Sequence, residues 1–179
     1  RCYGGNAKLA DLMKAMLNYG AAAQVLFDYN TENLANAALS EEDKVLAEVD
    51  ASAYASKITG SEDGIAIASA TLMLETETSV RIYFKLTGDK TIDQYRFFVD
   101  NVAVQPIEKD GKFYVEIKDI AAQDLDAKHT ITVGGLTIEY SGLSYVNTVL
   151  KNAEAAGEDL VNAAKALFAY NKTAEAYFN

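Results

Sequence analysis

The side chains best suited to bind a ligand lie in two segments of alternating polar and apolar residues, 80–86 and 112–118. Alternation of this kind predicts β-strands with one buried face, because successive side chains of a strand point to opposite sides of a sheet. If the apolar residues point inward, tyrosines and charged groups share the outer surface, where they can stack on a sugar or contact a protein partner. The candidate binding face consists of Arg81, Tyr83, Lys85, Tyr114, Glu116 and Lys118.

An ordinary solvated outer face is the simpler interpretation of the same pattern. The chain contains 11 tyrosines but no tryptophan. Tryptophan offers the largest aromatic face for stacking on a sugar, so its absence weakens the carbohydrate-binding interpretation more than the protein-binding one.

The sequence contains no recognisable catalytic or metal-binding motif. Metal-ligand spacings, a Cys/His pair, a phosphate-binding glycine loop and a nucleophile elbow are all missing. The single histidine, His129, follows a turn and begins a strand, so we expect a structural corner residue that bonds back to that turn. A carboxylate pair of the glycosidase type is a distant alternative, and Asp124 and Asp126 are the place to look for weak calcium binding. We therefore expect a protein that is not an enzyme and has no cofactor.

The net charge of −10 disfavours binding to nucleic acid and to anionic membrane surfaces. No apolar run approaches the roughly 20 residues needed to span a bilayer. The chain begins at Arg1 without a signal peptide, which suggests a fragment of a longer protein. The only cysteine, Cys2, cannot close an internal disulfide and precedes an expected flexible lead-in, Tyr3-Gly4-Gly5. These features predict a monomer that is held together by packing.

Two helices that repeat one another are expected to flank the strands. Residues 14–28 recur at residues 165–179, with an offset of 151 throughout. Three- and four-residue steps place the apolar positions of each copy on one stripe. The stripes are Leu9, Leu12, Met13, Met16, Gly20, Ala23 and Phe27, and then Leu160, Ala163, Ala164, Leu167, Asn171, Ala174 and Phe178.

The bulky Leu12 and Met13 correspond to the small Ala163 and Ala164 of the other copy, so we expect the two helices to pack together. Replacing Phe27 or Phe178 by alanine should then cost about 3–5 kcal/mol. Gly20 and Asn171 could each break their helix, or Gly20 could admit a close neighbour. We favour near-continuous helices, because the stripe continues beyond Gly20.

Between these helices, Ser40 is predicted to cap a short helix that ends near Val49, and residues 50–63 to form a surface connection. About seven strands follow, joined in part by two-residue turns at Asp100-Asn101, Asp110-Gly111 and Gly134-Gly135. The expected strands are 67–75, 80–87, 92–99, 102–107, 112–118, 130–133 and 136–140.

The predicted fold class is α+β, with an antiparallel immunoglobulin-like β-sandwich inserted between N- and C-terminal helices that pack together. The whole chain, residues 1–179, is expected to form a single compact unit. Its parts are an N-terminal helical part (7–63), a β-sandwich (64–140) and a C-terminal helical part (141–179).

Four stretches resemble a recurrent, poorly characterised module: KAMLNYGAAAQVLFDYNTENLAN, LETETSVRIYFKLTG, KFYVEIKDIAAQDLD and LTIEYSGLSYV. This module is found near the C-terminal ends of large secreted and cell-surface proteins of gut Firmicutes, often beside repeats, dockerins or carbohydrate-active domains. The similarity extends from about Ala7 to Phe178 and is most specific at YGAAAQ.

The resemblance implies an extracellular or cell-surface location and a non-catalytic accessory role, as a structural spacer or as an adhesion and protein-binding module of a larger protein. Its partners would be neighbouring domains of the parent protein, with a protein or a glycan as the candidate ligand. It carries over no functional residues. The alternative is a carbohydrate-binding module that uses the exposed tyrosines.

Overall fold

The computed structural model describes residues 3–74 and 77–179, and the chain divides into two compact units. The helical unit comprises the residues up to Ala53, Ala122–Leu125 and Val146–Asn179. The β unit comprises Tyr54–Ala121 and Asp126–Tyr145. The structure is therefore α+β, with helices at both ends of the chain, as predicted. The single compact unit that we expected stays a prediction.

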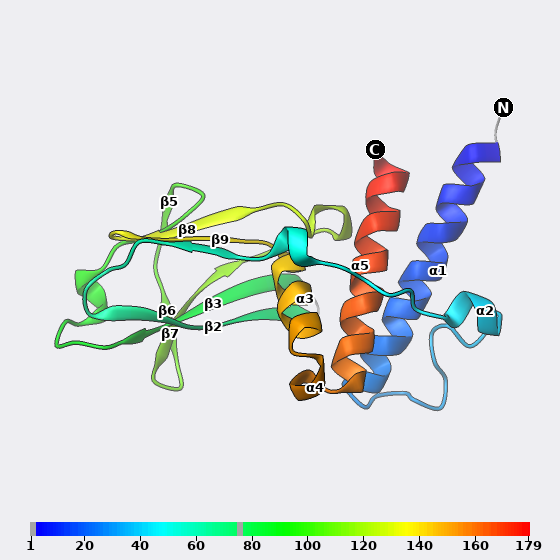
Figure 1. The fold of residues 1–179 in the computed structure, drawn as a ribbon, viewed down its shortest axis with the longest axis horizontal. Helices are drawn as coiled ribbons and strands as arrows, with labels where there is room; N and C mark the ends of the chain where they lie inside the picture. Colours follow the sequence, from blue (N-terminus) through cyan, green and yellow to red (C-terminus); the bar gives the residue numbers. More distant parts are fainter. Residues whose placement is uncertain (1–2, 75–76) are drawn as a thin grey trace. The chain divides into compact units, whose positions relative to one another are not determined.

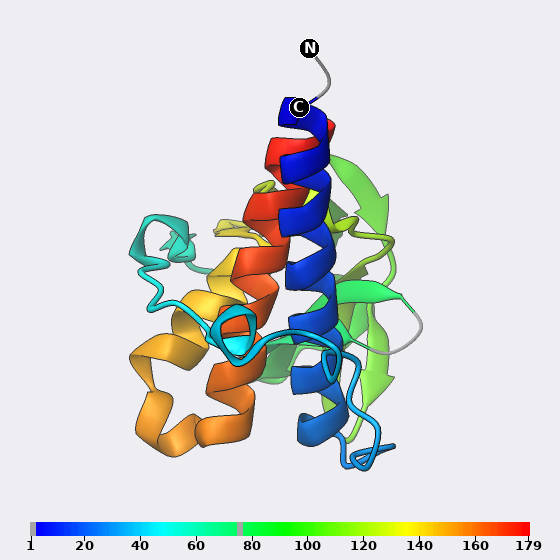
Figure 2. The ribbon, with the colours of Figure 1, turned by 90° about the vertical axis from the view of Figure 1, so that its right-hand side faces the viewer.

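The helical unit is built on α1 (Tyr3–Leu26) and α5 (Glu158–Phe178), which run antiparallel side by side (Figures 1 and 2). It also holds α2 (Glu41–Lys44), η3 (Ala122–Asp124), α4 (Ala153–Ala156) and most of α3 (Gly142–Lys151). The rings of Tyr19 and Tyr170, which are equivalent in the two copies, stack with centroids 5.7 Å apart. The predicted packing of the two copies is confirmed, and both helices continue through Gly20 and Asn171.

The buried side of α1 differs from the predicted stripe. Leu12 and Ala23 of the stripe are buried, as is Ala15 outside it, whereas Met13 is 54% and Met16 46% exposed. The stripe predicted from periodicity is wide, but α5 covers only the side of α1 that carries Leu12, Ala15 and Tyr19. In α5 the predicted stripe is confirmed at five buried positions, Ala163, Ala164, Leu167, Asn171 and Ala174.

Phe27 and Phe178 lie at the ends of the repeat and are 52% and 61% exposed. The burial on which the predicted cost of 3–5 kcal/mol rests is therefore wrong, because water already reaches much of each ring. The flexible lead-in is also wrong, because Tyr3, Gly4 and Gly5 belong to α1. A helix tolerates glycine in its first turn when the turns that follow propagate well. Cys2 lies outside the described residues.

Gln24 fixes the turn that follows α1. Its Nε2 donates hydrogen bonds to the carbonyl oxygens of Asn30 and Asn33, and its Oε1 accepts one from the backbone N–H of Ala35. A Cβ on Gly20 would lie 3.1 Å from the Cβ of Ala35, so the close neighbour of Gly20 is this turn and not a second helix.

Ser40 caps α2 as predicted, because its hydroxyl accepts a hydrogen bond from the backbone N–H of Asp43. The helix ends at Lys44 instead of near Val49, since Val45 has extended backbone angles.

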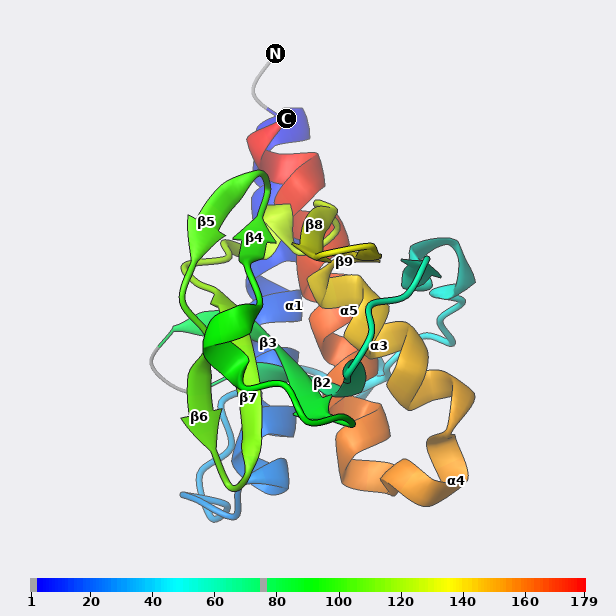
Figure 3. The same cartoon turned by 90° about the vertical axis from the view of Figure 1, so that its left-hand side faces the viewer.

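The β unit contains two antiparallel sheets, drawn as two layers in Figure 3. One has the order β1-β9-β8-β4-β5 and the other β2-β3-β7-β6. The strands are β1 (Lys57–Thr59), β2 (Ile65–Leu74), β3 (Thr78–Leu86), β4 (Phe97–Val99), β5 (Val102–Val104), β6 (Ile107–Lys109), β7 (Lys112–Ile117), β8 (His129–Val133) and β9 (Leu136–Tyr140). The rings of Phe84 and Phe97, one from each sheet, meet edge to face with centroids 5.2 Å apart. Both are fully buried, so the core of this unit lies between the sheets.

The three predicted turns are confirmed by positive φ angles, which are 50° and 65° at Asp100-Asn101, 52° and 75° at Asp110-Gly111, and 54° at Gly134. A short side chain or a glycine tolerates this left-handed backbone, which gives the turn the twist that a hairpin needs.

The strands differ from the prediction in three places. β1 lies in the segment expected to be a surface connection, where it pairs with β9. The expected strand 92–99 opens with the 3-10 turn η2 (Ile92–Gln94), and the expected strand 102–107 is split into β5 and β6. Pro106 stands at this split, where the chain passes from one sheet to the other and the missing proline N–H breaks no ladder. The end of the expected strand 67–75 lies outside the described residues.

Candidate functional site

The candidate binding face lies on β3 and β7, whose pairing sets Arg81 opposite Glu116 and Tyr83 opposite Tyr114. The Arg81 Nε atom is 3.1 Å from the Glu116 Oε1 atom. The Arg81 guanidinium also lies over the Tyr114 ring, 4.6 Å from its centroid, and the two tyrosine rings are 5.2 Å apart. The cross-strand register therefore gathers these four side chains into one cluster, here called the β3/β7 cluster.

Within the β3/β7 cluster, Arg81 and Glu116 form an ion pair in which both side chains are charged at neutral pH. Partial burial raises the pKa of the Glu116 carboxyl, but hydrogen bonds from the Ser79 hydroxyl, 2.7 Å away, and from Arg81 outweigh this and hold the pKa below its ordinary value. A hydrogen bond with Tyr83 raises the pKa of Arg81 above its already high ordinary value, and Glu116 adds to this.

The expected exposure of Tyr114 is wrong, because this side chain is only 8% exposed. The Arg81 guanidinium and the Tyr83 ring lie against it, and Arg81 and Tyr83 themselves are half-buried. Lys85 and Lys118 are exposed, and neither forms an ion pair within the described part of the chain. Four of the six predicted residues thus form one cluster, and two lie outside it.

His129 has a structural partner, but not the predicted one. Its Nδ1 atom lies 2.7 Å from Asp100 Oδ2, and the backbone N–H of Thr130 donates to Asp100 Oδ1. Burial raises the pKa of Asp100, but these two hydrogen bonds outweigh it and leave the pKa low. The expected bond back to the preceding turn is wrong, because β8 pairs with β4 and so begins beside the β4–β5 turn.

Asp124, one of the two aspartates considered for weak calcium binding, is the last residue of η3. Within residues 3–74 and 77–179, no group of three or more histidines, cysteines, aspartates or glutamates is placed to hold a metal ion. Among the same residues, no helix has both the length and the apolar character needed to cross a membrane.

A groove in the helical unit was missed by the sequence analysis. It lies between α1, the segment 34–46 and the first half of α5. Asp159, Asn162 and Lys165 line its α5 side at intervals of three residues. That interval is visible in the sequence, but only the folded 34–46 segment shows that these side chains face a hollow.

Comparison of the chain with protein-family models, with curated proteins and with solved structures finds no match in any of the three. The resemblance to the module of surface proteins from Firmicutes therefore stays a prediction.

Proposed function

We propose that this chain is a non-catalytic accessory module of a larger bacterial protein that is extracellular or attached to the cell surface. In this role it serves as a structural spacer or as an adhesion module that binds another protein. The observation that carries the proposal is the β3/β7 cluster. Tryptophan, tyrosine and arginine are enriched among the side chains that anchor protein interfaces. Here Arg81 is already held by Glu116, and Tyr83 is held by the ring of Tyr114. A partner that binds an ordered surface has less side-chain entropy to remove.

The proposal includes an immunoglobulin-like β-sandwich for the β unit. The orders β2-β3-β7-β6 and β9-β8-β4-β5 correspond to the two sheets of that fold, with β1 added beside β9. Nuclear Overhauser effects between the rings of Phe84 and Phe97 are expected if the two sheets stack in this way. Their absence in the folded protein would contradict the sandwich.

The carbohydrate-binding alternative has weaker support. A tyrosine that binds a sugar needs a free ring face, whereas the Arg81 guanidinium lies over the ring of Tyr114. Tyr83 is the only tyrosine of the cluster that is more than one-tenth exposed, so it would have to carry most of the stacking.

Two binding assays separate these functions. The wild-type protein, Tyr83→Ala and the control Tyr29→Ala, which alters an exposed tyrosine of the helical unit, are applied to a glycan array and to a panel of purified extracellular-matrix proteins. Protein binding that is lost only in Tyr83→Ala supports the adhesion role, and silence on both surfaces supports the spacer role. Reproducible glycan binding that is lost only in Tyr83→Ala would overturn the proposal in favour of the alternative.

A further inference from the structure

The groove of the helical unit has a volume of about 370 Å³, within the range of sites for small ligands. Its α5 side is polar, with Asp159, Asn162 and Lys165. Its α1 side is apolar at Ala21, Ala22 and Val25 and carries one amide, that of Asn18, which is already hydrogen-bonded to Asp43 and Asn36. We propose that this groove binds a short peptide of about three residues, holding both its free ends on α5 and its aliphatic side chains against α1.

The spacing of the polar side chains matches such a peptide. An α-helix rises 1.5 Å per residue, so Asp159 and Lys165 lie about 9 Å apart along the axis of α5, with Asn162 midway. An extended peptide advances about 3.3–3.6 Å per residue, which places the ammonium and carboxylate groups of a tripeptide about 7–10 Å apart. Asp159 then faces the ammonium group and Lys165 the carboxylate. Asn162 faces a peptide group between them, to which its amide can both donate and accept a hydrogen bond.

Asp159 and Asn162 are available to a ligand. Within the described ranges 3–74 and 77–179, neither side chain has an ion-pair or hydrogen-bond partner. Lys165 is paired with Glu48 at 2.9 Å, but the Glu48 side chain is 92% exposed whereas that of Lys165 is only 18% exposed. The carboxylate of Glu48 can therefore turn into water at little cost, and a ligand carboxylate can take its place.

The groove contains a second cation. Lys44 also lines the groove, and its partner Glu41 has a side chain that is 91% exposed.

A single amino acid is too short to reach both Asp159 and Lys165, and a neutral sugar has no ammonium group for Asp159. The groove belongs entirely to the helical unit, so this inference does not depend on the function proposed for the β unit.

Calorimetric and NMR titrations of the full chain with the tripeptide Ala-Val-Ala test the inference. The same peptide is used with its amino end acetylated, with its carboxyl end amidated, and with both ends blocked. We expect saturable binding of the free peptide and a loss of about tenfold or more on blocking either end, because each end loses a charge-assisted hydrogen bond.

Two variants assign each end of the peptide to its partner, and two more serve as controls. In Asp159→Asn, acetylation of the peptide should cause no further loss of affinity. In Lys165→Gln, amidation should cause a smaller loss than in the wild type, because Lys44 is the cation that remains in the groove. The matched controls Asp11→Asn and Lys8→Gln alter exposed residues of α1 outside the groove and should bind as the wild type does. The absence of chemical-shift changes at about 10 mM peptide would overturn the inference. Equal binding of the free and doubly blocked peptides would overturn it as well.

Discussion

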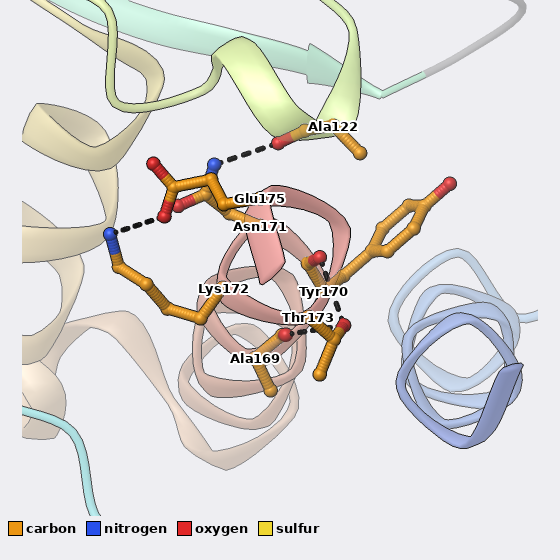
Figure 4. Close-up of polar contacts among 7 residues, drawn as sticks. All are labelled: Ala122, Ala169, Tyr170, Asn171, Lys172, Thr173 and Glu175. Atoms are coloured by element: carbon orange, nitrogen blue, oxygen red, sulfur yellow. Dashed lines mark hydrogen bonds and ion pairs between the residues drawn. The ribbon is translucent and has the colours of Figure 1, made fainter. Parts of the chain in front are cut away.

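Asn171 of α5 is fully buried, and its replacement by aspartate is a sensitive test of the packing in the helical unit. The Asn171 Nδ2 atom donates a hydrogen bond of 2.7 Å to the carbonyl oxygen of Ala122 in η3 (Figure 4). The Oδ1 atom has no hydrogen-bond partner within the described part of the chain. This bond joins the turn η3 to α5, and within the described residues no donor faces the Oδ1 position, where a new negative charge would lie.

The Asn171→Asp variant keeps the shape of the side chain but removes its donor. An ionised carboxylate would face the Ala122 carbonyl oxygen. The carboxylate of Glu175, one helical turn further on, is paired with Lys172 at 2.9 Å and therefore adds little repulsion. A protonated carboxyl could still donate to Ala122. Burial and the facing carbonyl oxygen should raise the pKa of the new carboxyl by about three units. At 1.36 kcal/mol per unit, the variant should lose about 4 kcal/mol of the free energy of unfolding at neutral pH.

The sign of the pH dependence follows from proton binding. The unfolded carboxyl releases its proton near pH 4, whereas the folded carboxyl retains its proton to about pH 7. Between these values the folded state holds more protons, so the free energy of unfolding of the variant falls as pH rises. The difference from the wild type should be smallest below about pH 4 and largest above about pH 7.

Urea unfolding followed by circular dichroism, at several pH values between about 4 and 8, measures this difference. The control Asn171→Ala also loses the bond to Ala122 but introduces no ionisable group, so it should cost about 1–3 kcal/mol at every pH. If Asn171→Asp unfolded within about 1 kcal/mol of the wild type at pH 7, or if its deficit did not change with pH, the geometry around Asn171 would be wrong.

Three further predictions use other positions. In thermal melts, Phe178→Ala should lose less than about 1 kcal/mol of the free energy of unfolding, because its side chain is 61% exposed. Leu167→Ala should lose about 2–5 kcal/mol, because its side chain is only 4% exposed. Equal losses would contradict this difference in burial. Burial raises the pKa of Tyr19 to about 12, so the protein should lose stability as pH rises from about 10 to about 12. Tyr19→Phe should reduce that loss in urea midpoints, and an unchanged loss would refute the burial of the phenol. Gly60→Ala should lower the free energy of unfolding by more than about 2 kcal/mol, because its Cβ would lie 2.1 Å from a backbone oxygen. Gly111→Ala places its Cβ in open space and should cost about 1 kcal/mol. Similar melting temperatures of the two variants would contradict this difference.

The local features of this protein were determined by the sequence itself. The turn at Asp100-Asn101 has the positive φ angles predicted, because only a few residue types tolerate that backbone. The alternation in 80–86 set Ile82 and Phe84 inward, because a strand has a fixed period of two. The repeat at 14–28 and 165–179 also predicted that two similar helices would pack together, which the stacking of Tyr19 on Tyr170 shows.

The tertiary structure decided which part of each apolar or polar face is covered by other elements of the protein. Met13 and Leu12 are adjacent in a plausible stripe, yet only Leu12 is buried, because α5 covers one narrow side of α1. Tyr114 was predicted to be exposed and is covered by the side chain of Arg81, which reaches it from the neighbouring strand. The groove beside Asp159 depends on a segment that lies more than 100 residues earlier in the chain. Periodicity records how side chains are distributed around one element, but their burial depends on residues that are distant in the sequence.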